Sequence, residues 1–250
     1  MTPVHALLIG AAGLVGGAVN AVAGGGTLLT FPALLATGLG PVTANITSSV
    51  GLLAGYAGGS VAYRRELVSQ RERARSLVVV SVLGGIAGAV LLLLTPPAAF
   101  RAVVPYLVLL SCALLAAQPW LARALGERPH GSPDLHWGVR AGVGVSAVYG
   151  SYFGAGLGVL LLAVLGILVS DDLQRLNALK GVLSFVVNVV GVVVFVASGH
   201  VAWLAAAILA VTSYAGGTVG VGVARRLSPV VMRAAVVTLG TAVGIALLVS

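Results

Sequence analysis

The residues of this chain that are able to bind a charged solute are few, and several of them share one face of a helix. Lys180 lies within an apolar stretch, with Asn177 three residues before it and Ser184 four residues after it. Asn188 continues this polar stripe by a further turn. A lysine inside a bilayer costs about 2.5–3.5 kcal/mol, which confines it to cavities or lets it extend to the headgroups near a helix end. A cation beside amide and hydroxyl donors favours an anion as the ligand.

Two glycine-rich interruptions provide a second kind of donor. They break two apolar segments and consist of Gly24, Gly25 and Gly26 followed by Thr27, and of Gly156 with Gly158. Glycine is a poor helix former, and an opened helix frees backbone N–H groups at the positive end of the half-helix that follows. Transporters use such ends to hold anionic substrates. Close packing of helices is the alternative use of small residues, and it explains glycines at four-residue spacing such as Gly84 and Gly88 better.

The ionisable residues give no sign of an enzyme or a metal centre. The six acidic residues lie in or near the expected loops and are Glu66, Glu72, Glu127, Asp134, Asp171 and Asp172. A carboxylate relay through the membrane is therefore not expected. No His, Cys, Asp and Glu cluster has metal-ligand spacing, and a single cysteine excludes an intramolecular disulfide. We expect no catalytic residues, no metal ligands and no cofactor.

The composition explains which elements must position these residues. Of the 250 residues, 59% are hydrophobic and 8% are charged, and the mean hydropathy is +1.10. A soluble domain of this size needs about a quarter of its residues charged to cover its surface, whereas lipid solvates an apolar surface. The net charge of +8 comes from basic residues beside apolar runs, which is typical of membrane topology and not of nucleic-acid binding.

The hydrophobic segments divide into single crossings and longer, broken ones. A helix needs ~20 apolar residues to cross a bilayer. Six segments meet this length, namely 42–63, 76–95, 102–122, 176–197, 201–224 and 229–249. The segments 4–37 and 138–169 are longer than one crossing requires and contain the glycine interruptions. Each of these two is expected to form a broken helical hairpin.

The two broken segments belong to an internal duplication. A shift of 132 positions carries Asn45 onto Asn177 and aligns many residues without a gap. The matched pairs include Gly24 with Gly156, Gly26 with Gly158, Ser48 with Lys180, Ser81 with Ser213, Pro97 with Pro229 and Arg101 with Arg233. Asn, Pro and Arg rarely match by chance at one fixed offset. The sequence therefore predicts two repeats, 1–125 and 138–250, joined by a linker at 126–137.

The arginines of the loops predict how the repeats are oriented. Loop 64–75 holds five arginines and its counterpart at 198–200 holds none. Loop 225–233 holds three and its counterpart at 95–101 holds one. Because basic loops face the cytoplasm, the repeats are expected to insert in opposite orientations. Three full helices plus a hairpin that returns to its own side give the odd number of crossings that this requires, with both termini outside the cytoplasm.

Two stretches of the sequence are similar to those of a known family. The stretch GLVGGAVNAVAGGGTLLTFP at 13–32, together with ANITS at 44–48, resembles the signature of the sulfite exporter TauE/SafE family. The second glycine interruption and the helix with Asn177, Lys180 and Asn188 resemble the second half of that family. The resemblance spans nearly the whole chain. It implies a transporter of small sulfur-containing anions such as sulfite or organosulfonates, and it adds Asn20 and Thr47 to the substrate-binding residues.

These observations predict an all-α integral membrane protein that consists of two inverted-topology repeats, each a glycine-broken hairpin plus three transmembrane helices. The expected function is secondary transport of a small anion by alternating access, with the site between the repeats. A passive anion channel with the same donors is the alternative, and a membrane-embedded enzyme would need a nucleophile–base pair that is lacking. The oligomeric state stays open, with a homodimer among the options. The predicted substrate-binding residues are Asn20, Gly24, Gly25, Gly26, Thr27, Asn45, Thr47, Ser48, Gly156, Gly158, Asn177, Lys180, Ser184 and Asn188.

Overall fold

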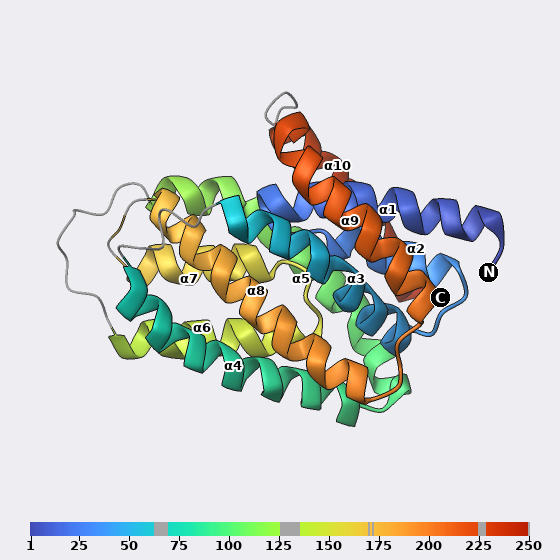
Figure 1. The fold of residues 1–250 in the computed structure, drawn as a ribbon, viewed down its shortest axis with the longest axis horizontal. Helices are drawn as coiled ribbons and strands as arrows, with labels where there is room; N and C mark the ends of the chain where they lie inside the picture. Colours follow the sequence, from blue (N-terminus) through green and yellow to red (C-terminus); the bar gives the residue numbers. More distant parts are fainter. Residues whose placement is uncertain (63–69, 126–135, 170, 172, 225–228, 250) are drawn as a thin grey trace.

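The part of the chain that the structure describes is built entirely from helices (Figure 1). The computed structural model describes all residues except 63–69, 126–135, 170, 172, 225–228 and 250. The first five helices are α1 (Pro3–Ala23), α2 (Thr27–Ala36), α3 (Pro41–Ala62), α4 (Arg71–Leu94) and α5 (Pro97–Leu125). The others are α6 (His136–Tyr152), α7 (Leu157–Leu168), α8 (Leu173–Ala197), α9 (Trp203–Ala224) and α10 (Pro229–Val249). The predicted all-α class is confirmed.

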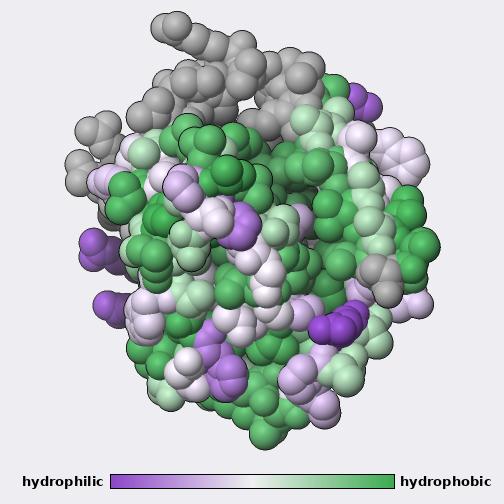
Figure 2. All heavy atoms as spheres, turned by 90° about the vertical axis from the view of Figure 1, so that its right-hand side faces the viewer, coloured by the Kyte–Doolittle hydropathy of each residue, from purple (hydrophilic) through white to green (hydrophobic). Residues whose placement is uncertain are grey.

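The outer surface of the helices is apolar, as the lipid phase requires. Four helices among the described residues are long and apolar enough to cross a membrane, at Pro3–Asn20, Arg71–Leu94, Pro97–Trp120 and Arg175–Ala197. Large apolar side chains are strongly exposed, for example Leu7 at 75% and Val211 at 72%. The end of the molecule in Figure 2 carries scattered hydrophilic residues among hydrophobic ones. Exposed apolar side chains such as Leu7 and Val211 are favourable where lipid surrounds the helices and unfavourable where water does.

Helices α4 and α5 each begin five residues earlier than the hydropathy of the sequence predicts. Helix α4 begins at Arg71 and not at 76, because arginine is a good helix former even where it looks like a loop residue. Helix α5 begins at Pro97 and not at 102, since proline is favoured in the first turn of a helix. Helix α3 carries the polar residues Asn45, Thr47 and Ser48 within an apolar sequence. These three side chains are fully buried.

The broken segments form pairs of helices in which the second member is short. Helices α2 and α7 have 10 and 12 residues, which at 1.5 Å per residue is about half the thickness of the hydrocarbon core. Helix α2 extends toward the right-hand end of the molecule and α7 toward the left-hand end (Figure 1). Their first turns are therefore the ends that lie nearest the middle of the molecule.

Helices α3 and α8 lie side by side and run in opposite directions. The Thr47 hydroxyl on α3 accepts a hydrogen bond of 3.1 Å from the amide of Ala202, just beyond α8. Tyr56, further along α3, interacts with Asn188, which lies earlier on α8. Helix α4 runs parallel to α8, because Gln70 donates to the carbonyl of Arg175 while Gly85 packs on Val190.

Helix α9 runs parallel to α3, since Gly51 packs on Leu209 and Gly55 on Ser213. The Ser213 hydroxyl donates to the carbonyl of Gly51 at 2.8 Å, which fixes this contact. Helix α9 is therefore antiparallel to α8 and to α4. The most extensive contacts between helices follow the same pattern in the two halves of the chain. Helix α1 packs on α9 as α6 packs on α4, and α3 packs on α9 as α8 packs on α4.

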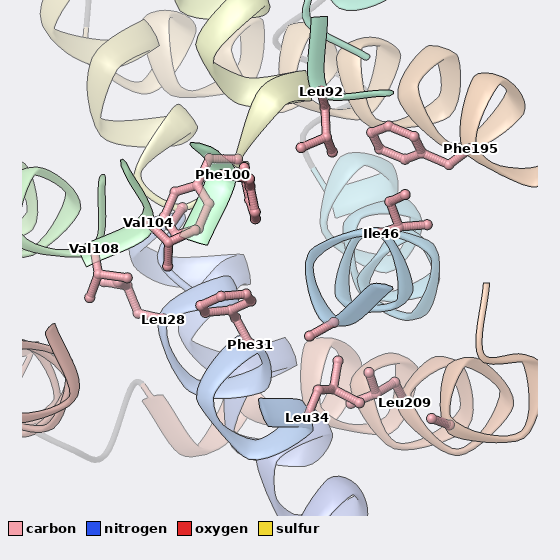
Figure 3. Close-up of a cluster of buried hydrophobic side chains, with 14 of the residues drawn as sticks. Leu28, Phe31, Leu34, Ile46, Leu92, Phe100, Val104, Val108, Phe195 and Leu209 are labelled. Carbon is pink, nitrogen blue, oxygen red and sulfur yellow. The ribbon is translucent and has the colours of Figure 1, made fainter. Parts of the chain in front are cut away.

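The main hydrophobic core surrounds α2. Figure 3 shows Leu28 and Phe31 of α2 facing Phe100, Val104 and Val108 of α5. The ring of Phe31 also meets the ring of Phe153 edge to face, with centroids 5.5 Å apart. A second cluster joins α7 and α8 through leucines such as Leu161 and Leu183. Both short helices are therefore held by apolar packing, which fixes the positions of their first turns.

Small residues allow the closest helix contacts, as the glycine spacing predicts. A Cβ atom at Gly88 of α4 would overlap the carbonyl oxygen of Val148 on α6, and one at Gly84 would lie 2.7 Å from the carbonyl oxygen of Gly144. Real Cβ atoms essentially never lie so close to another atom. These glycines therefore serve close packing.

We expect Gly88→Ala to destabilise the folded protein by about 1–3 kcal/mol, the usual cost of overpacking. The matched control is Gly181→Ala on α8, where a Cβ atom would meet nothing within 4 Å. Removing glycine from a helix interior stabilises it by roughly 0.5–1 kcal/mol when space allows. The midpoint of unfolding by sodium dodecyl sulfate in mixed micelles measures the stability of both variants. Equal midpoints for the two variants would contradict the packing described here.

Candidate functional site

The two glycine interruptions contact each other in the interior of the protein. A Cβ atom at Gly24 would lie 3.0 Å from the Cα atom of Gly158 and 3.3 Å from its amide nitrogen. All of the interruption residues Gly24, Gly25, Gly26, Gly156 and Gly158 are buried. The sequence predicts that both interruptions line one site between the repeats, and in the structure they contact each other although they are more than a hundred residues apart in the chain.

The local conformation of the interruptions depends on glycine. Gly24 ends α1 with a φ of 77°, and its amide donates to the carbonyls of Asn20 and Val19. Gly156 precedes α7 with a φ of 81°. Residues with a side chain rarely adopt this left-handed backbone, because the Cβ atom approaches the following carbonyl. The chain therefore turns sharply at both places, and α2 and α7 begin beside this contact.

The first turn of α2 is a buried end with polar side chains around it. Gly26 caps α2 without a side-chain hydrogen bond. Within the described residues, the amides of Gly26 and Thr27 have no hydrogen-bond acceptor. The hydroxyls of Thr30 and Ser48 are 2.5 Å apart, and Thr30 also donates to the carbonyl of Gly26. Free amides at a helix start carry a partial positive charge, which makes this end attractive to an anion.

Asn45 connects α3 to the second interruption. Its side-chain amide donates a hydrogen bond of 2.9 Å to the carbonyl of Tyr152, the last residue of α6. The end of a helix leaves carbonyls without partners, and Asn45 satisfies one of them. The Oδ1 atom of Asn45 is buried and has no partner among the described residues. Ser111 of α5 supports the same interruption by donating to the carbonyl of Ala155 at 3.0 Å.

Three polar side chains from both halves of the chain gather between α1, α3 and α8. The Tyr56 hydroxyl interacts with the amides of Asn20 and Asn188, and both asparagines are 7% exposed. Asn188 also donates to the carbonyl of Ser184 at 2.8 Å. Neither polar atom of the Asn20 amide makes a hydrogen bond of regular geometry with a described residue. The Asn20 amide is thus a buried donor and acceptor that is able to serve a ligand.

Lys180 lies apart from these three residues. It precedes Asn188 by eight positions on α8, which is about 12 Å along a helix. Helical spacing places it between the leucine face that packs on α7 and the polar stripe of Asn177, Ser184 and Asn188. Lys180 and Asn177 are half-buried. Neither of the ion pairs found among the described residues, Arg73–Asp171 and Arg175–Asp171, includes Lys180.

The remaining predicted residues have distinct surroundings. Thr27 lies 3.5 Å from the position of a Cβ atom on Gly154, so it borders the second interruption as well as the first. Thr47 accepts the amide of Ala202 and therefore fastens α3 to the start of α9. The Ser184 hydroxyl is buried without a partner among the described residues.

Several residues near the interruptions are not among those that the sequence predicts. Tyr56 is one, because an aromatic residue in an apolar run is usually part of a core. The duplication holds a signal for it, since the shift of 132 positions carries Tyr56 onto Asn188 and Asn20 onto Tyr152. Thr30 and Ser111 have no such signal. Only the folded chain shows that their hydroxyls reach the interruptions.

Comparisons with known proteins show which family the chain resembles. Residues 9–247 match the sequence profile of the family described as Sulfite exporter TauE/SafE. The chain is 26% identical over 208 residues to the probable membrane transporter protein YfcA of Escherichia coli strain K12, which covers 83% of this chain and 76% of that protein.

Two further relatives are equally distant. A probable membrane transporter protein of Haemophilus influenzae is 25% identical over 208 residues, which is 83% of this chain and 80% of the relative. The probable membrane transporter protein ORF9 of a Sinorhizobium species is 26% identical over 217 residues, with 84% and 79% covered. No solved structure matches the chain significantly. The family profile spans nearly the whole sequence, and the chain is therefore a multi-pass membrane protein that belongs to the sulfite exporter TauE/SafE family.

Proposed function

We propose that this protein is a secondary transporter that moves a small oxyanion, sulfite or an organosulfonate, across the cell membrane by alternating access between two inverted repeats. The anion binds where the starts of α2 and α7 meet. Membrane transport itself follows from the family and from relatives described as probable membrane transporters. The substrate class and the mechanism are the proposal.

The single observation that carries the proposal is the contact between Gly24 and Gly158. It brings the positive ends of two half-helices to one buried place, where both favour a negative charge. Oxygen atoms of sulfite or a sulfonate are suitable acceptors for the amides of Gly26 and Thr27, for nearby hydroxyls and for the amide of Asn20. The described carboxylates Glu72 and Asp171 stand at the start of α4 and before α8, away from these donors.

The directions of the helices support inverted repeats. The shift of 132 positions carries α3 onto α8 and α4 onto α9. The contacts given above make α3 antiparallel to α8, and α4 antiparallel to α9. Corresponding helices of the two repeats thus point to opposite sides of the membrane. A site at the centre of such a pair is able to open to either side when the repeats rock against each other.

Transport by purified protein in liposomes tests the proposal. We expect saturable uptake of sulfite that is inhibited by methanesulfonate and accelerated by unlabelled sulfite inside the vesicles. Acceleration by internal substrate is a property of a carrier, whereas a channel conducts without it. Absence of sulfite and sulfonate movement in vesicles that contain folded protein would refute the substrate class. Uptake that neither saturates nor responds to internal anion would favour the channel.

The inverted topology predicts opposite sidedness for loops 64–75 and 198–200. A single cysteine is placed in either segment of a Cys112→Ala variant and tested with a membrane-impermeant maleimide on intact cells. We expect labelling at 198–200 and none at 64–75 until the membrane is opened. Labelling of both segments from the same side would rule out inverted repeats.

A further inference from the structure

A cavity of about 600 Å³ opens at the end of the molecule where α3 begins and α4 ends. Its wall includes Thr43 near the start of α3, Thr95 at the end of α4, Arg101 near the start of α5 and His200 in the connection between α8 and α9. This is the end seen in Figure 2, where hydrophilic residues interrupt the apolar surface. The positive-inside rule places it away from the cytoplasm, because the loops here hold few arginines.

The charge of the cavity suits an anion. The guanidinium of Arg101 is exposed and takes part in neither of the ion pairs found among the described residues. The lining residues include no carboxylate. Arginine holds oxyanions through two parallel N–H donors, and the His200 ring and the hydroxyl of Thr43 add further donors. A cationic cavity without a counter-charge concentrates small anions at its mouth.

The cavity is connected to the glycine interruptions through Tyr152. The Tyr152 hydroxyl donates a hydrogen bond of 3.4 Å to the hydroxyl of Thr95 in the cavity wall. The carbonyl of the same residue accepts the hydrogen bond from Asn45. Thr43 of the wall precedes Asn45 by two positions on α3. Tyr152 therefore contacts both Thr95 in the cavity wall and Asn45 beside the second interruption.

The opposite end of the molecule differs in the corresponding residue. The duplication pairs Arg101 with Arg233. The Arg233 side chain is half-buried, and its Nε atom is buried without a partner among the described residues. At that same end, Asp171 holds both Arg73, at 2.8 Å, and Arg175, at 3.4 Å. Of this matched pair of arginines, Arg101 is exposed and Arg233 is half-buried.

We propose that the cavity with Arg101 and His200 is a second anion site, which captures the small oxyanion before it enters the central site. This inference rests on the proposed function for the identity of the anion. Capture at a cationic mouth raises the local concentration of substrate. It should therefore lower the half-saturating concentration of transport without changing the maximal rate.

The direct test measures the cavity without transport. Ala98, an exposed residue of the wall, is replaced by cysteine in a Cys112→Ala variant and treated with anionic or cationic methanethiosulfonate reagents. We expect Arg101→Gln to lower the ratio of anionic to cationic labelling rates about tenfold, and methanesulfonate to slow labelling. The control Arg75→Gln removes the same charge from the other end of α4.

A ratio that Arg101→Gln leaves unchanged, or that Arg75→Gln lowers equally, would overturn the capture site. In liposomes, Arg101→Gln should raise the half-saturating sulfite concentration about tenfold at an unaltered maximal rate. If labelling depends on Arg101 and methanesulfonate protects while no anion is transported, the capture site stands and the proposed function fails. If transport occurs and the labelling ratio does not depend on Arg101, the proposed function stands and the capture site fails.

Discussion

Replacing Gly24 with alanine is expected to abolish anion transport, with a rate at least about a hundredfold below that of the natural protein. The added Cβ atom would face two penalties. The φ of 77° costs about 1–2 kcal/mol for a residue with a side chain. The same atom would lie 3.0 Å from the Cα atom of Gly158 and force the two interruptions apart. Liposome uptake of sulfite measures the effect.

The neighbouring glycine provides the control for this prediction. A Cβ atom at Gly25 would lie 3.3 Å from a side-chain methyl group of Leu115, which is able to move. Gly25 also has no left-handed φ. We expect Gly25→Ala to retain transport within about tenfold of the natural protein, because the contact between the interruptions is preserved. Equal loss in both variants, or full activity of Gly24→Ala, would contradict the role given to the contact.

Lys180→Ala is expected to weaken anion binding at least about tenfold. The Lys180 side chain lies half-buried on α8, and neither of the ion pairs found among the described residues includes it. A charge-assisted hydrogen bond to an oxyanion contributes about 1.5–3 kcal/mol, which corresponds to at least a tenfold loss of affinity when the charge is removed. Lys180→Arg should retain part of the binding because it keeps the charge. Calorimetric titration of purified protein with sulfite gives the affinity of each variant.

The comparison for Lys180 uses a cation outside the proposed site. Arg71→Ala removes an exposed positive charge at the start of α4 and should leave the affinity unchanged. Sulfite uptake by Lys180→Ala that matches the natural protein would remove Lys180 from the binding residues. The glycine interruptions would then hold the anion through amides and hydroxyls alone.

The sequence predicts the elements of this fold well because each depends on local properties. Apolar length identifies the crossings, and glycine runs identify the places where α1 and α6 end. The same local logic places α4 and α5 too late, since arginine and proline look like loop residues but are favourable in a first turn. The boundaries differ where propensity and hydropathy disagree.

Long-range contacts in the candidate site are beyond the reach of a single sequence. Asn45 is recognisable as polar in an apolar run, but its bond to the carbonyl of Tyr152 spans 107 positions. Tyr56 reads as a core aromatic until the fold places it between Asn20 and Asn188. Such contacts depend on which helices become neighbours, and composition and spacing contain no information on that choice. The duplication is the exception, because it relates distant residues through one fixed offset.

The claim on which the account depends is that both repeats contribute to one central anion site. Calorimetric titration of the purified protein with sulfite tests it most directly, together with Asn20→Ala in the first repeat and Asn188→Ala in the second. The account predicts that the affinity of this central site falls about tenfold in each variant, since both amides serve the same ligand. An affinity of the central site that depends on only one of the two asparagines would contradict it.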